Sequence, residues 1–184
     1  NFIVLNNLKG IKESHFDNIF ITTKINEDLK KIFLNIDKFV NDKTIIVTPC
    51  TSIPFWWHKC LTNKLQNKID QKLDPIFKKN LKRKNLVGMT MWLSGKVDKP
   101  GHVRISHIQR GFPIKEVFIE RKKQVDQIRK ELKKSTKSPL VKNIFSEVFI
   151  KSINSLAFNM IALKYNQNNS ELDRNYVAKK EIIK

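Results

Sequence analysis

The stretch on which the predicted fold depends runs from Gly88 to Gln109 and reads GMTMWLSGKVDKPGHVRISHIQ. Over residues 88–97 apolar and polar side chains alternate, so the two sets face opposite sides of a strand. Pro100 and Gly101 follow as a turn, because proline presets the second turn position and glycine accepts the positive φ of the third. The pattern predicts an antiparallel hairpin with strands over 88–97 and 102–109.

Helices and strands are also expected upstream of this hairpin. Apolar residues recur at three- and four-residue spacing from Ile25 to Val40, which is typical of an amphipathic helix. Ile19–Ile21 and Thr44–Thr48 are predicted strands, the second because of its β-branched run. Two more helices are expected over 59–73 and 76–84, with a loop between Cys50 and Trp57.

The second half of the chain is expected to complete a sheet around a charged insertion. Val117–Ile119 is predicted as a third strand, and Phe158–Tyr165 as a strand that closes the sheet. A charged helix over 120–137 has an apolar stripe of only three residues, which buries too little surface to hold a long helix on a core. We therefore expect this helix to project from the sheet and to be ordered by RNA or a neighbouring protein.

Composition points to a polyanionic partner. The 184 residues include 36 lysines and arginines against 17 aspartates and glutamates, which gives a net charge of +19. So much self-repulsion is best tolerated when nucleic acid or an acidic membrane surface neutralises it. No apolar run approaches the roughly 18 residues that a membrane span needs.

Residue types that carry catalysis or bind metals form no recognisable site. Cys50, His58 and Cys60 are spaced as C-x7-H-x-C, which matches no common zinc site, and no acidic partner supports a thiol nucleophile. No glycine-rich phosphate loop and no paired carboxylates occur. We therefore expect no catalytic residue, no cofactor, no bound zinc and no disulfide between Cys50 and Cys60.

A run of basic residues is the strongest candidate for a binding site. Like charges on one helix face repel, and a row of phosphates reverses that penalty. The alternative is a plain solvated helix face. The run comprises Lys78, Lys79, Lys82, Arg83 and Lys84. The aromatic residues 55–57 could stack on bases, but a hydrophobic anchor for the following helix is favoured.

Two stretches of the chain resemble the family of small-subunit ribosomal protein three. Phe77–Lys82 resembles its Phe-Arg-Arg-Ala-Met-Lys segment, and Gly88–Val97 resembles its strand that ends in Ser-Gly-Arg-Leu. Arg104 falls at the arginine of the next strand, and Gly111–Ile114 resembles the family's Gly-x-x-Pro-Leu.

The same resemblance extends to both sides of these stretches. Asn26–Phe39 and Thr44–Pro49 resemble the last helix and strand of the family's KH module, and Ser146–Tyr165 resembles its closing strand. The glycine loop of that module is absent from residues 23–26.

The resemblance implies an α+β fold in three parts. Residues 1–53 would form a partial, degenerate KH-like module. Residues 54–165 would form a C-terminal α+β domain with a mixed or antiparallel sheet, helices on one face and an insertion near 120–145. Residues 166–184 would form a polar tail.

The implied function is structural rather than enzymatic. The chain would bind ribosomal RNA in the head of a mitochondrial small subunit near the messenger RNA entry channel, beside neighbouring ribosomal proteins and away from membranes. The RNA-binding residues would be Lys78, Lys79, Lys82, Arg83, Lys84, Lys96, Arg104 and Arg110. The alternatives are another basic nucleic-acid-binding protein, such as a nuclease or maturase fragment, and a basic membrane-surface or matrix protein.

Overall fold

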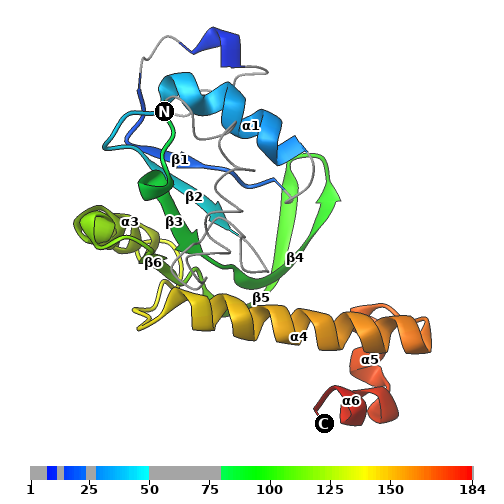
Figure 1. The fold of residues 1–184 in the computed structure, drawn as a ribbon. Helices are drawn as coiled ribbons and strands as arrows, with labels where there is room; N and C mark the ends of the chain where they lie inside the picture. The colour runs from blue at the N-terminus through cyan, green and yellow to red at the C-terminus, as the bar shows by residue number, and fades with distance from the viewer. Residues whose placement is uncertain (1–7, 12–14, 24–27, 50–79, 184) are drawn as a thin grey trace, which may run out of the picture.

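A computed structural model describes residues 8–11, 15–23, 28–49 and 80–183 (Figure 1). Its main sheet has the strand order β1-β2-β3-β6, and strands β4 and β5 form a separate hairpin. The main-sheet strands are β1 (Asn18–Phe20), β2 (Ile45–Pro49), β3 (Leu86–Met89) and β6 (Ile114–Glu116). The first three are parallel, and β6 runs antiparallel to β3.

The two central strands are buried on both faces. Ile45 and Val47 of β2 point into one apolar cluster, whereas Ile46 between them points into another. A strand that is covered on both faces reads as a continuous apolar run, which explains the β-branched segment. The parallel pairing of β2 with β3 joins segments on either side of residues 50–79 in one sheet, and the expected boundary at residue 53 lies outside the described residues.

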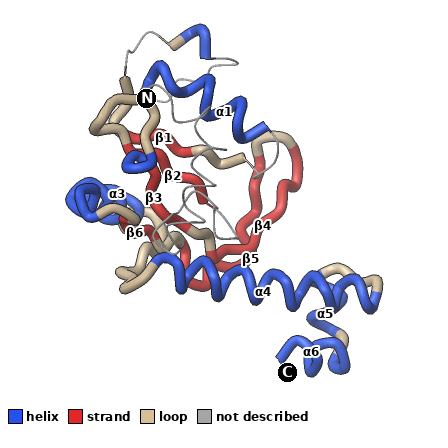
Figure 2. The backbone as a smooth tube through the Cα atoms, in the orientation of Figure 1, coloured by secondary structure: helices blue, strands red, loops and turns tan. Residues whose placement is uncertain are grey.

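Helices cover both faces of this sheet (Figure 2). On one face α1 (Asp28–Ile36) buries Phe33 and Ile36 against the cluster that contains Ile46. On the other face α3 (Lys122–Leu132) buries Val125 and Ile128, 2% and 8% exposed. Short 3-10 turns lie at Leu8–Gly10, Asp37–Phe39, Arg83–Asn85 and Ile119–Arg121. The layers are therefore helix, sheet, helix.

The predicted hairpin is confirmed. β4 (Trp92–Lys99) and β5 (His102–Gly111) pair antiparallel around the turn, where Gly101 has a φ of +78°. The alternating stretch is nevertheless two strands and not one. Gly88 and Met89 belong to β3 of the main sheet, and the chain passes into the hairpin only at Trp92.

The predicted closing strand is wrong. Residues 144–165 form one helix, α4, whose first turn is capped by Asn143, since its Oδ1 accepts from the Phe145 amide at 2.9 Å. Asn166, with a φ of +49°, ends the helix. The chain then folds back as α5 (Asn169–Arg174) and α6 (Tyr176–Ile183), so the predicted polar tail is helical.

Two more expectations are corrected around α3. The charged helix does not project, because its short apolar stripe packs on the face of β2, β3 and β6. The third strand lies at 114–116, three residues before the predicted one. Among the described helices none is long and apolar enough to cross a lipid bilayer.

Candidate functional site at the carboxyl ends of the strands

Two buried polar side chains follow the end of β3. Thr90 is fully buried, and Trp92 is 7% exposed. Within the described part of the chain, Thr90 Oγ1 and Trp92 Nε1 have no hydrogen-bond partner. Buried polar atoms are nearly always paired, so each of these two atoms calls for a partner such as an ordered water or a ligand. Open parallel sheets bind ligands at this edge, beyond the carboxyl ends of the strands.

Lys151 of α4 brings a positive charge to this place. Its Nζ lies 4.9 Å from the centroid of the Trp92 ring, a cation–π distance. Burial lowers the pKa of Lys151 below the ordinary lysine value, and no carboxylate contributes to that shift. A partly desolvated ammonium attracts an anionic ligand and gives up its proton more readily than an exposed lysine.

Glu147 lies one helical turn before Lys151, on the same face of α4. Its Oε1 accepts a hydrogen bond from Arg110 Nη2 of β5 at 2.9 Å. Its Oε2 is buried and has no partner among the described residues. The buried Ile144 and Val148 fix this part of α4 in the apolar cluster beneath the sheet. Figure 1 shows α4 running below β3 and the hairpin. From this helix Glu147 contacts Arg110 of β5, and Lys151 lies over Trp92 of β4.

The five residues Thr90, Trp92, Arg110, Glu147 and Lys151 are called here the carboxyl-end site. The site combines the Lys151 ammonium, the ion pair of Arg110 with Glu147 and two neutral polar groups. Such a set can bind a small organic acid and hold a proton near one of its oxygens. The described residues contain no cluster of histidine, cysteine or acidic side chains that could hold a metal ion.

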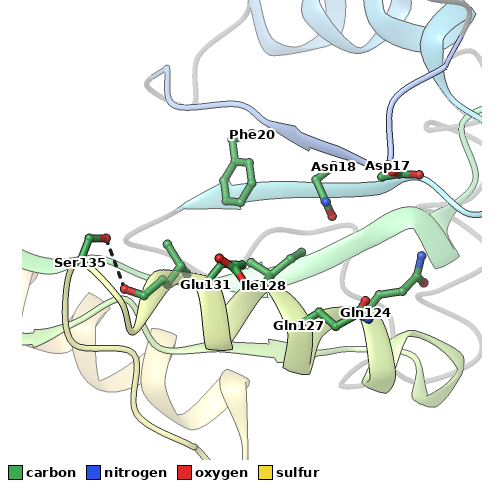
Figure 3. Close-up of a pocket in the computed structure, with 9 residues that line it drawn as sticks. Asp17, Asn18, Phe20, Gln124, Gln127, Ile128, Glu131 and Ser135 are labelled. Atoms are coloured by element: carbon green, nitrogen blue, oxygen red, sulfur yellow. Dashed lines mark hydrogen bonds between the residues drawn. The ribbon is translucent and has the colours of Figure 1, made fainter. Parts of the chain in front are cut away.

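A concave region lies between β1 and α3 (Figure 3). It encloses 610 Å³ and is separate from the carboxyl-end site. Its lining comprises Asp17, Asn18, Phe20, Gln124, Gln127, Ile128, Glu131, Leu132 and Ser135. We call it the edge groove, because β1 is an edge strand of the main sheet.

The predicted basic residues that the structure describes lie at two places in the fold. Lys82 and Arg83 precede β3 at its amino end, and Lys84 pairs there with Asp42 at 3.0 Å. The side chain of Arg104, on the hairpin, pairs with Asp98 at 2.8 Å.

The other predicted basic residues lie on the hairpin or outside the residues that the structure describes. The backbone of Lys96 lies in β4, whereas Lys78 and Lys79 lie outside the described residues, as do Cys50, His58 and Cys60. Arg110 alone belongs to the carboxyl-end site, where its half-exposed side chain pairs with the Glu147 carboxylate.

Sequence reasoning missed Thr90, Trp92, Glu147 and Lys151. One signal could have found two of them, because residues 144–163 contain no other charged side chain than Glu147 and Lys151. Two charges spaced by four in a helical apolar run share one face. Predicting a strand over this segment removed that signal, since a four-residue spacing has no such meaning there.

No family model matches the sequence, and no curated protein matches it. Solved structures do match the fold. The D-mandelate dehydrogenase solved with NADH and anilino(oxo)acetate has a TM-score of 0.64 at 18% identity, over 94% of this chain and 49% of that one. A protein described as a ketopantoate reductase from Ralstonia solanacearum MolK2 has a TM-score of 0.70 at 12% identity, over 91% and 52%. A 2-dehydropantoate 2-reductase from Enterococcus faecalis has 0.55 at 13%, over 92% and 48%.

These similarities correct the family and the fold class. Each of the three structures is a dehydrogenase or reductase, and the chain spans about half the length of each. The α+β fold with a degenerate KH-like module is wrong, because three parallel strands lie between helices on both faces. The fold is similar to the Rossmann-like fold of these structures.

The function and the partners that the resemblance implies are therefore corrected as well. The non-enzymatic ribosomal role is contradicted by the dehydrogenases and reductases that share the fold. The same finding contradicts the expected partners, namely ribosomal RNA, messenger RNA and ribosomal proteins. It also contradicts the nuclease, maturase and membrane-surface alternatives. The mitochondrial location stays a prediction.

Proposed function

We propose that this chain is part of a nicotinamide-dependent oxidoreductase that acts on a small 2-oxo or 2-hydroxy acid. The observation that carries the proposal is the partly buried Lys151 ammonium over Trp92 at the end of β3. The similar structures are named for mandelate and for ketopantoate, which is the same acid as 2-dehydropantoate, and each of these two acids has a hydroxyl or carbonyl group beside the carboxylate. A carboxylate with a neighbouring oxygen fits a site in which the Lys151 ammonium lies beside neutral polar groups.

Each group of the carboxyl-end site has a part in this proposal. The Lys151 ammonium binds the acid and holds a proton at the oxygen of its carbon 2, and its lowered pKa makes it an effective general acid. Trp92 Nε1 donates, and Thr90 Oγ1 donates or accepts, to the remaining substrate oxygens, which supplies the partners that both atoms lack. Arg110 is a positioning residue, since it holds Glu147 by one carboxylate oxygen.

The dinucleotide is not held by a recognisable feature of these residues. Rossmann-like domains bind its pyrophosphate with a glycine-rich turn between a strand and a helix. The five glycines of this chain stand at 10, 88, 95, 101 and 111, so none follows a strand and opens a helix in the described residues. The residues present therefore do not fit the pyrophosphate, and we assign no step to the cofactor here.

Titration of the chain with anilino(oxo)acetate, followed by calorimetry and by the NMR signal of the Trp92 indole N–H, tests the proposal. We expect binding that shifts the indole signal and weakens as the pH rises and Lys151 loses its proton. Lys151→Met should weaken binding by about tenfold or more, because the ammonium is lost. The matched variant Lys142→Met, at an exposed lysine before α4, should stay within about twofold. Absence of binding, or equal binding by both variants, would contradict the proposal.

A further inference from the structure

A stripe of exposed apolar side chains runs along α4. Its members recur at alternating four- and three-residue spacing, which is the spacing of the a and d positions in a coiled-coil seam. The members are Phe149, Ile153, Leu156, Met160 and Leu163, which are between 50% and 82% exposed. We call these five residues the α4 seam. Single exposed apolar residues are ordinary on a protein surface, whereas a continuous row of large ones marks a contact surface.

The opposite face of α4 holds the helix on the rest of the molecule. Ile144 and Val148 are buried in the apolar cluster beneath the sheet, and Lys151 lies over Trp92. At about 100° per residue, Lys151 lies about 200° around the helix from Phe149. Figure 1 shows the second half of α4 extending beyond the sheet, with α5 and α6 folded back against it. The α4 seam is therefore the open face of a helix that is anchored by its other side.

The charge pattern indicates which kind of partner fits this face. The chain has 36 basic residues, but none belongs to the α4 seam, and the positions that flank the seam are neutral. Those flanking positions are Ile150, Ser152, Ala157 and Asn159. Lys164, at the end of the seam, is already paired with Glu181 at 2.6 Å. A helix on a lipid surface carries lysines or arginines on its polar face, and an acidic partner needs cations to pair with. The neutral flanks fit a second apolar helix better than either.

The α4 seam is complementary to a second copy of itself. In an antiparallel pair related by a two-fold axis, each a position lies opposite a d position of the other copy, and every contact occurs twice. Such a pair places Ile153 opposite Leu156 of the second copy, and Phe149 opposite Met160, whose flexible side chain adapts to an aromatic ring. The antiparallel direction also opposes the two helix dipoles and keeps the two positively charged sheets at opposite ends of the pair.

The area of the α4 seam is sufficient for a reversible dimer. A large apolar side chain has a surface of about 150–200 Å², so the exposed parts of the seam residues and Ile150 amount to roughly 600 Å² per copy. Two copies would bury about 1,200 Å² in total, which is the lower limit for a specific interface. We propose that two copies of this chain associate through the α4 seam as an antiparallel helix pair. The seam lies opposite Lys151, so the association does not rest on the proposed function.

Sedimentation equilibrium of the full chain, from about 1 µM to about 500 µM, tests the proposal at about 0.15 M and about 0.5 M sodium chloride. We expect a monomer–dimer equilibrium whose dissociation constant falls at the higher salt, because salt screens the repulsion between two copies of charge +19. Leu156→Lys should raise the dissociation constant by about tenfold or more, since it places a charge in the middle of the interface. Asn154→Lys adds the same charge at an exposed position of α4 outside the seam and should stay within about twofold.

A charge exchange tests the antiparallel register. Ile153→Glu and Leu156→Lys should each be monomeric alone at about 50 µM, because each buries an unpaired charge. A mixture of the two variants should form a one-to-one dimer, since the introduced carboxylate of one chain then faces the introduced ammonium of the other. Both positions are at least half exposed in the single chain, so circular dichroism should show that each variant is folded.

Three results would overturn the proposal. They are a monomer at every concentration and both salts, equal effects of Leu156→Lys and Asn154→Lys, and the absence of a mixed dimer in the charge exchange. A monomer that Leu156→Lys destabilises toward urea, while Asn154→Lys does not, would assign the α4 seam to a contact within one chain and also overturn it. No acid is present in these measurements, so their outcome is independent of ligand binding at Lys151.

Discussion

Gly111 stands where the end of β5 meets the segment that follows α3. Its φ is +70°, and a Cβ placed on it would lie 2.1 Å from the Lys137 carbonyl oxygen. The next amide, of Phe112, donates to that same carbonyl at 2.8 Å. The turn therefore depends on a residue without a side chain, and it sets the place from which Arg110 reaches Glu147.

Gly111→Ala should lower the free energy of unfolding by about 2–4 kcal/mol, because strain and a backbone clash add. Gly101→Ala is the matched control, since its φ of +78° is similar but no atom lies within 4 Å of the added Cβ. It should cost about 1 kcal/mol, the price of the left-handed conformation alone. Urea unfolding of both variants measures the difference, and equal costs would show that the contact with Lys137 relaxes freely.

Lys151 should also leave a signature in stability. Its pKa is lowered in the folded chain, so below that pKa both states are protonated and the cost of burying the charge is fully present. As the pH rises from the lowered pKa toward the ordinary value of 10.5, the unfolded state binds more protons and stability increases. Lys151→Met should therefore stabilise the chain at neutral pH, by less than about 1 kcal/mol because the group is partly solvated.

Urea unfolding at neutral pH and again near about pH 10 measures this effect, and the advantage of the variant should shrink at the higher pH. The exposed Lys142→Met should show neither the gain nor its pH dependence. A neutral-pH loss of stability in Lys151→Met would mean that its contact with Trp92 outweighs the burial of its charge.

At the level of elements, α3 is held on the main sheet by a small buried apolar surface. Val125→Ala should cost about 2 kcal/mol, because Val125 is 2% exposed and packs on the main sheet. Val177→Ala on α6, where the side chain is 58% exposed, should cost no more than about 0.5 kcal/mol. In the isolated chain the amides of α3 should be protected from hydrogen exchange. Rapid exchange throughout α3 would instead support a helix that projects from the sheet.

Local signals in the sequence were sufficient for some elements. The hairpin, β1, β2 and α1 follow from alternation, a Pro-Gly turn and helical spacing, all of which act within a few residues. α3 was predicted as a helix but placed wrongly, because packing depends on the distant strands β2 and β3 that provide its contact surface. α4 was missed because an apolar run without clear periodicity fits a buried strand and a helix equally well.

The candidate site was less predictable than the elements. Thr90, Trp92 and Lys151 are ordinary residues in the sequence, and they become a site only because α4 passes the end of β3. The charge of Arg110 singles it out in the sequence, but its ion pair with Glu147 of α4 depends on a contact between distant segments. The resemblance to a ribosomal family rested on short ordered segments, which carry no information on whether strands pair in parallel.

For the whole molecule, the net charge of +19 means that positive side chains repel one another. Repulsion among like charges destabilises a compact chain, and salt screens it. The free energy of unfolding should therefore rise between about 0.02 M and about 0.5 M sodium chloride. Urea unfolding at the two concentrations checks this, with glucose at equal osmolality as the control. A decrease with salt would show that ion pairs such as Arg110–Glu147 outweigh the repulsion.

The parallel pairing of β2 with β3 also constrains the order of folding. Between Pro49 and Leu86 the chain must close a loop of 36 residues before the central pair can form, whereas the β4–β5 hairpin closes over only a two-residue turn. Hairpins form in microseconds, and non-local pairing is slower. The hairpin, with Trp92 at its start, is thus positioned to form early, and the sheet that gives Lys151 its place beside Trp92 is completed last.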